Sequence, residues 1–440
     1  MISRWPFIAV LVLACSGCAT YADRATAIRQ AFYANDLARA QKTVDEELKR
    51  GGGEADVLTL ERAMIDLAAG RPAEAEQKLR KVRDHFDELE GVDLTGSTLS
   101  YLTDDQRRAY AGEDYEKVLI RAFLALSNLM HDGGDAEAYS LQMIDKQERI
   151  ITAGADREGK NPKLSYQRVA LAPYLRGVLR EATHRDFDDA QRSFASVVSW
   201  QPSFLPGPQD LQRASYGRHS EPGNGVLYVF ALTGRGPFKQ ESIEVPTTAA
   251  LLIAGEILSV AGSQTVPPNV APVKVPRVFA QNSLVESITV INDGETLGKT
   301  AVITDVSDLA VSQYEAVLPS IVARAVARRI VKKGFVYGAK EAADMAKGTP
   351  AGLALDLAGV AWEATESADT RCWGLLPDKI QVLRVELPQG EHDIQLAPVV
   401  AGKSRSSVKT RVSIENGRNT YMLANFPNER LVGQVISSTR

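Results

Sequence analysis

A recurring spacing of small and bulky residues in the N-terminal half constrains the fold more than any other feature. From Tyr21 to Trp200 the chain is rich in Ala, Leu, Glu, Gln and Arg, with apolar residues at helical spacing, which predicts helices. A turn residue is followed five positions later by alanine and, four positions further, usually by a bulky residue. The units are Asn35, Ala40 and Val44; Gly70, Ala75 and Leu79; Gly133, Ala138 and Gln142; and Arg185, Ala190 and Phe194.

These offsets resemble the tetratricopeptide helix pair, in which the small residue lets two helices approach and the bulky residue fills the groove. The first two units start 35 residues apart (70 minus 35), close to the period of that repeat. Because later gaps are irregular, we expect a degenerate tetratricopeptide-like array with insertions near residues 91–114 and 152–163. An unspecialised helical bundle is the alternative. In both cases stacked helix pairs form a broad concave surface suited to a peptide or a protein.

Composition changes abruptly after Trp200. Prolines and glycines over residues 201–225 interrupt a helix, and short alternating segments with hairpin sequences follow, which is typical of an antiparallel β-sandwich. We therefore predict an α+β protein with four parts after a signal peptide. They are a helical tetratricopeptide-like domain over 18–202, a linker over 203–225, a β-rich domain over 226–440, and helical insertions in that domain near 247–262 and, as a helical hairpin, 315–366.

The N-terminus indicates export and lipidation. Arg4 and the apolar run from Phe7 to Ala14 predict a secretory signal peptide over 1–17, too short to be a membrane span. Ser16 and Gly17 directly precede Cys18, as in lipoproteins whose cysteine sulfur takes a diacylglycerol and whose acyl chains include palmitate. Cys15 is the alternative modified residue, and an ordinary signal peptide is the third interpretation. Several acyl chains make a stable anchor.

Charge and composition exclude several classes of function. The chain has 51 Lys and Arg against 55 Asp and Glu, a net charge of −4, so no nucleic-acid partner is expected. Five scattered histidines show no ligand spacing, and we predict no metal and no cofactor. Residues 294–300 have three residues between their glycines where a phosphate-binding loop has four. Ser406 and Lys409 lie in a predicted strand, whereas a serine–lysine catalytic pair needs a helical turn. We therefore predict no catalytic residues.

One basic row could face a membrane. Arg324, Arg328 and Lys332 share a side of the first predicted helix of the 315–366 hairpin, and such a row could contact anionic lipid headgroups. The ordinary interpretation is a solvated helix face.

Three segments resemble a family of bacterial envelope lipoproteins that combine tetratricopeptide-like N-terminal repeats with a β-rich C-terminal region. They are YAGEDYEKVLIRAFLAL from Tyr110, LPSIVARAVAR from Leu318 and ADTRCWGLLPDKIQVLRVELPQGEHDI from Ala368. Ala19 likewise resembles the residue that follows the lipidated cysteine in lipoproteins sent to the outer membrane. The resemblance implies a lipid-anchored protein on the periplasmic face of that membrane. It implies envelope proteins as partners, among them small lipoproteins of the curli-secretion or peptidoglycan-synthase-activator type, and carries over no catalytic residues.

Asp369, Arg371 and Trp373 follow the predicted hairpin and precede a predicted strand. The ordinary interpretation is a buried Trp373 with an Asp369 cap or an Arg371 ion pair that fixes the insertion to the sheet. The functional interpretation is a partner-docking site, because Trp and Arg dominate protein interfaces.

Together these features predict a membrane-anchored, noncatalytic adaptor for envelope or secretion-complex assembly. Two alternatives stay open: a cell-wall enzyme whose site forms only in the fold, and an oligomeric secretion accessory.

Overall fold

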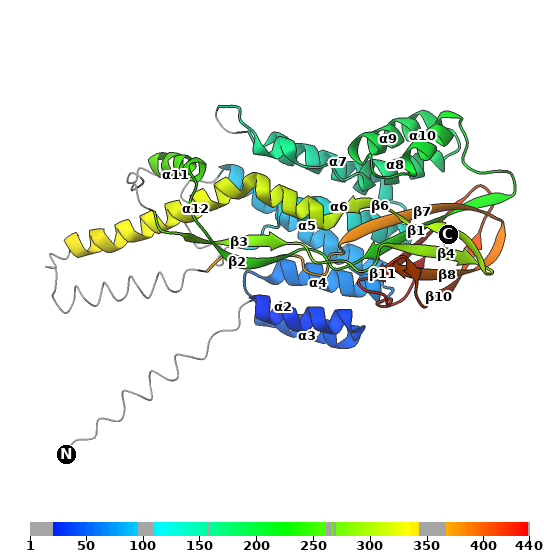
Figure 1. Ribbon diagram of the computed structural model, residues 1–440, viewed down its shortest axis with the longest axis horizontal. Coiled ribbons are helices and arrows are strands. Elements are labelled where there is room, and N and C mark those ends of the chain that lie inside the picture. The colour runs from blue at the N-terminus through cyan, green and yellow to red at the C-terminus, as the bar shows by residue number, and fades with distance from the viewer. Residues whose placement is uncertain are drawn as a thin grey trace, which may run out of the picture.

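The N-terminal part of the protein is a continuous array of helices. A computed structural model describes residues 21–95, 109–155, 158–260, 266, 270–342 and 367–438. Consecutive helices of the array pack on one another (Figure 1). They are α2 (Tyr21–Tyr33), α3 (Leu37–Arg50), α4 (Ala55–Ala68), α5 (Pro72–Thr95), α6 (Asp114–Leu129), α7 (Ala136–Thr152), α8 (Leu171–Glu181), α9 (Phe187–Trp200) and α10 (Gly207–Ser215).

Each unit of the predicted spacing contains a helix–turn–helix connection. The turn residues Asn35, Gly70 and Gly133 have positive φ angles of 62°, 76° and 71°, and in the fourth unit the positive φ falls on His184. Such a residue ends one helix and redirects the chain into the next. The alanines and bulky residues of three units are buried, whereas Ala138 of the remaining unit is exposed and Ala136 is buried instead.

Two sheets form most of the C-terminal part. The first has the strand order β12 (Ile436–Ser437), β11 (Asn419–Phe426), β1 (Asn224–Thr233), β7 (Lys379–Pro388) and β6 (Ala301–Asp305). The second has the order β10 (Val408–Ile414), β8 (Gly390–Val400), β4 (Ser287–Asn292) and β5 (Glu295–Lys299), with β9 (Lys403–Ser404) beside β8.

The prediction of purely antiparallel sheets is wrong at one strand pair. β1 and β11 run parallel, with Val226 opposite Asn419 and Thr233 opposite Phe426, and every other pair is antiparallel among the described strands. β1 enters the sheet directly from the helical array, so no hairpin turn dictates its direction relative to β11. A parallel pair requires a long connection, which the intervening chain supplies.

The first sheet is the middle of three layers. Tyr228 and Phe230 on one face of β1 belong to the core shared with the helices. Leu227 and Val229 on the other face pack in a second core with the strands of the second sheet. Since successive residues of a strand point to opposite faces, a run of buried residues along β1 joins the helical array to the sandwich.

The predicted linker over 203–225 is not a free connection. It contains α10, which packs on α9, and the buried Phe204. Proline interrupts helix interiors but is tolerated in the first turn, and Pro208 occupies that position in α10. The helical and β-rich parts therefore share one continuous core.

A separate cluster forms what we call the arm: β2 (Phe238–Glu244), β3 (Val273–Phe279), α11 (Thr248–Val260) and α12 (Val306–Ala342). The arm extends from one end of the body (Figure 1). α11 matches the insertion predicted near 247–262. α12 begins before the predicted 315 and continues through Pro319 as one helix, whereas the second helix of the predicted hairpin lies outside the described residues. None of the helices described here combines the length and apolarity that a membrane crossing requires.

The C-terminal residues pack against the first helix pairs. The Gly433 N–H donates to Asn35 Oδ1 at 2.7 Å and the Gln434 N–H to the Ala68 carbonyl at 3.0 Å. Gly433 has a φ of 76°, and a Cβ atom there would lie 1.8 Å from the Ala68 carbonyl oxygen.

We expect Gly433→Ala to lower the free energy of unfolding by about 2 kcal/mol or more, because backbone strain and a backbone clash add. Gly402→Ala is the matched control, since Gly402 has a φ of 70° with open space around it and should cost only about 1 kcal/mol. Urea unfolding of both variants measures the difference. Equal losses of unfolding free energy in the two variants would contradict the packing of Gly433 against Ala68.

Candidate functional site

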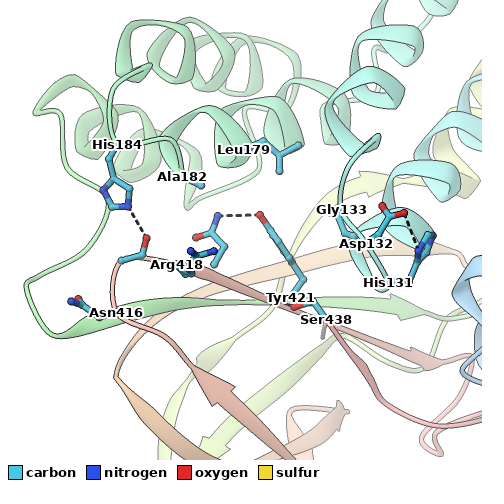
Figure 2. A pocket seen from close by; sticks show the side chains of 13 residues that line it. His131, Asp132, Gly133, Leu179, Ala182, His184, Asn416, Arg418, Tyr421 and Ser438 are labelled. Carbon is cyan, nitrogen blue, oxygen red and sulfur yellow. Dashed lines mark hydrogen bonds and ion pairs between the residues drawn. The ribbon is translucent and has the colours of Figure 1, made fainter. Parts of the chain in front are cut away.

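A pocket of about 570 Å³ opens between the helical array and the first sheet. It lies where the α6–α7 connection, the end of α8 and the β10–β11 turn meet (Figure 2). This volume lies in the range of small-molecule and peptide-end sites. His131, Asp132 and His184 line it from the helical side, and Arg418 and Tyr421 from the strand side.

A buried carboxylate positions His131 at the edge of the pocket. Glu76 of α5 is 3% exposed and accepts hydrogen bonds from Tyr139 Oη at 2.7 Å and Asn128 Nδ2 at 3.2 Å, and from His131 Nε2. Burial opposes ionisation of Glu76, but these donors and the Arg80 charge hold its pKa below the ordinary value. His131 Nδ1 lies 3.5 Å from Asp132 Oδ2, so a carboxylate faces each ring nitrogen.

A chain of polar contacts joins the helical side of the pocket to its strand side. His184 Nε2 donates to the Gly417 carbonyl at 2.6 Å, and its ring centroid lies 4.6 Å from that of His219. His219 Nε2 lies 2.8 Å from Asn419 Oδ1, and Asn419 Nδ2 donates to Tyr421 Oη at 3.0 Å. These contacts fix the α8–α9 connection to the β10–β11 turn (Figure 2).

The lining favours a polar or anionic group. Arg418 supplies guanidinium donors, and Asp132 is the one carboxylate among the described residues that line the pocket. The ring nitrogens of His131 already face Glu76 and Asp132, and His184 Nε2 donates to Gly417. Glycoside hydrolysis generally uses two carboxyl groups that face one another, and this lining does not present such a pair. Within the described parts of the chain, no three His, Cys, Asp or Glu side chains are grouped to hold a metal ion.

Trp373 lies inside the protein, on what we call the crossing segment (residues 368–376). Its side chain is 0% exposed. Its ring packs edge-to-face with that of Phe123, and the two ring centroids lie 5.4 Å apart. The Trp373 N–H donates to Glu116 Oε1 at 2.8 Å. The N–H groups of Gly374 and Leu375 donate to the two oxygens of Glu61 at 2.8 and 2.9 Å. Carboxylates of α6 and α4 therefore hold three consecutive backbone amides.

Arg371 and Asp369 form an ion pair in the same segment. Arg371 Nη2 lies 2.7 Å from Asp369 Oδ2, and Nη1 donates to the Gly53 carbonyl at 2.7 Å. Arg371 is 4% exposed, and its guanidinium lies 5.4 Å from the Tyr110 ring centroid. In this structure the buried Trp373 and the Arg371–Asp369 ion pair match the ordinary interpretation. Their contacts, however, join the segment to α6 at Phe123 and to helix connections at Gly53 and Tyr110, whereas that interpretation placed them between the insertion and the sheet. Docking of a partner at these residues stays a prediction.

Sequence reasoning missed Glu61 and Glu116, the residues that hold the crossing segment. Burial raises the pKa of Glu61 to about 7, against the opposing effects of the Arg29 charge and the two backbone amides. Burial and the nearby Glu113 also raise the pKa of Glu116. The available signal was an acidic residue within an apolar helical run, because a buried carboxylate needs donors from elsewhere.

The other predicted site residues lie apart from the pocket. Arg324 is exposed and Arg328 half-buried on α12, and the side chain of Lys332 is not among those described. Cys18 and the alternative Cys15 lie outside the described residues. Cys372 is a buried free thiol whose pKa burial raises, and Arg29 Nη2 lies 3.6 Å from its sulfur.

Comparisons with known proteins returned no matching family model, curated protein or solved structure. The resemblance to envelope lipoproteins therefore stays a prediction from the segments that carry it, and function is inferred from this chain's own residues.

His219 should make stability depend on pH. Burial lowers its pKa to about 4, reinforced by the nearby His184 and Arg384, whereas an unfolded histidine titrates near 6.5. Between these pH values the unfolded chain binds a proton that the folded chain does not. The contribution of His219, at most about 3 kcal/mol, is therefore lost as pH falls through this window.

The test compares the free energy of unfolding of the wild type and His219→Gln between these two pH values. The difference in unfolding free energy between the wild type and the variant should become smaller as pH falls. All other titrating groups contribute equally to both proteins and drop out of this difference. His85→Gln, on the half-exposed α5 surface, is the control. A difference that is constant with pH would contradict the assignment.

Replacing Glu61 by glutamine should release the crossing segment. A glutamine amide places a donor opposite the N–H of Gly374 or Leu375, so we expect a loss of about 2 to 4 kcal/mol in unfolding free energy. Faster proteolysis within residues 367–378 should accompany it. Glu46→Gln, on an exposed part of α3, should change neither. Unchanged proteolysis in Glu61→Gln would show that the carboxylate does not secure the segment.

Proposed function

We propose that the protein is a lipid-anchored lipoprotein on the periplasmic face of a bacterial outer membrane, where it acts as a noncatalytic adaptor. One end attaches to the membrane and the other receives a partner protein. Partners of the small envelope lipoprotein type implied by the sequence fit this role.

The observation that carries the proposal is the separation of two ends in one continuous body. α2 begins at the end from which the arm extends, and Cys18 precedes Tyr21 by only three residues. The pocket lies at the other end, between α8 and β11 (Figure 1). Because the helices and the first sheet share a core, the pocket has a fixed place relative to the end that carries the anchor.

The helical array fits a degenerate tetratricopeptide-like architecture in its turn positions and buried alanines, and we carry that assignment as part of the proposal. In such arrays a peptide typically occupies the concave surface. Here the chain's own crossing segment lies against α4 and α6 through Glu61 and Glu116. We therefore assign partner binding to the pocket and its rim, where Arg418, His131 and Asn416 are accessible.

Radiolabelled palmitate should enter the wild-type protein and the Cys15→Ser variant in growing cells, and Cys18→Ser should abolish the label. The reason is that only the cysteine after the cleaved signal can keep the acyl chains. Equal labelling of the wild type and a variant that lacks both early cysteines would overturn the anchor.

A photo-crosslinking residue at position 418 should give a discrete adduct with an envelope protein, because that side chain lies at the pocket rim. The matched control is position 409 on β10, which is exposed and is not part of the pocket lining. Mass spectrometry identifies the adduct. Adducts of the same kind at both positions, or none at 418, would contradict partner binding at the pocket.

A further inference from the structure

The arm carries a concentration of exposed apolar side chains. Nine large apolar residues are prominently exposed among the described parts of the chain, and four of them lie within residues 243–260. They are Ile243 at 69%, Val245 at 71%, Leu252 at 67% and Val260 at 47% exposed. Single exposed apolar residues are ordinary, but a group of them on a projecting element marks an interaction surface.

α11 is a short and largely apolar helix. Over Thr248–Val260 its only charged residue is Glu256. Ala250, Ala254 and Leu258 pack into the core of the arm, whereas Leu252 faces outward. At 13 residues the helix is too short to cross a bilayer, and an interfacial position suits an apolar helix of this length.

The charges of α12 match an anionic surface, whereas α11 has one exposed acidic residue, Glu256. Between Glu315 and Glu341, α12 has six basic residues and no acidic one, and Arg324 among them is exposed. On the β2–β3 ribbon, Glu241 pairs with Lys274 at 2.9 Å and Glu244 with Arg277 at 3.8 Å. The acidic residues of the ribbon are thus neutralised. Each Lys or Arg near an anionic leaflet contributes about 1 kcal/mol of attraction.

The anchor would hold the arm close to the bilayer. The Tyr21 hydroxyl donates to the Cys372 carbonyl at 3.3 Å, and the Ala368 N–H donates to Glu241 Oε2 at 2.9 Å. Hydrogen bonds therefore connect the start of α2 to the crossing segment and the crossing segment to Glu241 of β2. Glu241 lies two residues before the exposed Ile243. Three residues span at most roughly 11 Å when extended, so a lipid on Cys18 keeps this end of the body within that distance of the membrane.

We propose that the arm docks on an anionic phospholipid bilayer, with the apolar residues Ile243, Val245 and Leu252 entering the interface and Arg324 of α12 near the headgroups. The inference rests on the lipid anchor of the proposed function and adds a second membrane contact to it. The arm thereby fixes the orientation of the body relative to the membrane.

The test uses the full lipidated protein in vesicles of phosphatidylcholine with roughly 30% phosphatidylglycerol, which also contain a nitroxide-labelled lipid. An environment-sensitive fluorophore is attached to Leu252→Cys, and Cys372 is buried and does not compete for the label. Leu205→Cys in the α9–α10 connection, where the residue is 81% exposed against 67% for Leu252, is the matched control. Flotation of the same samples reports whether the anchor holds the protein.

The fluorophore at position 252 should shift to the blue and lose about half its intensity by quenching, since interfacial helices lie at the depth of the headgroup and acyl boundary. The fluorophore at 205 should do neither, and replacing phosphatidylglycerol by phosphatidylcholine should weaken the effect at 252.

If the protein floats but the fluorophore at 252 is quenched no more than the one at 205, the arm inference fails and the anchor stands. If the protein does not float, both fail. A blue shift at 252 that requires an added envelope extract and not the lipid would assign the arm to a protein partner and overturn the inference.

Discussion

The structure depends on two buried carboxylates that accept three backbone N–H groups. Glu61 and Glu116 come from different helices and bind the amides of residues 373–375, which lie between α12 and β7. Neither side could be buried alone, because a buried carboxylate without donors and an amide without an acceptor are both strongly destabilising. This mutual requirement fixes the crossing segment against the helices, and through it the arm and the first sheet take their positions.

The same interaction changes how the helical array can be used. The chain's own crossing segment lies against α4 and α6, with Trp373 in the core beside Phe123. An external peptide would have to displace a tryptophan that is 0% exposed and two paired carboxylates. A buried donor or acceptor left without its hydrogen-bond partner costs about 1 to 3 kcal/mol, and more if the group is charged. That cost favours the open pocket as the place where a partner binds.

Local features of the fold could be predicted from the sequence, and distant pairings could not. Asn35, Gly70 and Gly133 mark helix connections because their backbone angles and the following alanines are encoded within ten residues. The parallel β1–β11 pair joins residues almost two hundred positions apart, and the sandwich pattern alone does not determine strand direction. Glu61 lies in an apolar helix, but its partners are more than three hundred residues away. The pocket likewise forms only where a helix connection meets the β10–β11 turn.

A membrane contact at the arm would give the body a defined orientation relative to the bilayer. Acyl chains on Cys18 alone would attach the body at one point and would not define its rotation about that point. A second contact on the same rigid body is an intramolecular event, so even a weak affinity of the arm is amplified by its high effective concentration at the membrane. The helices, the first sheet and the arm are packed together, so fixing the arm also fixes the pocket, at the end away from the bilayer. In the proposed adaptor role, the lipid anchor and the arm together would hold the pocket at a set height and angle above the membrane.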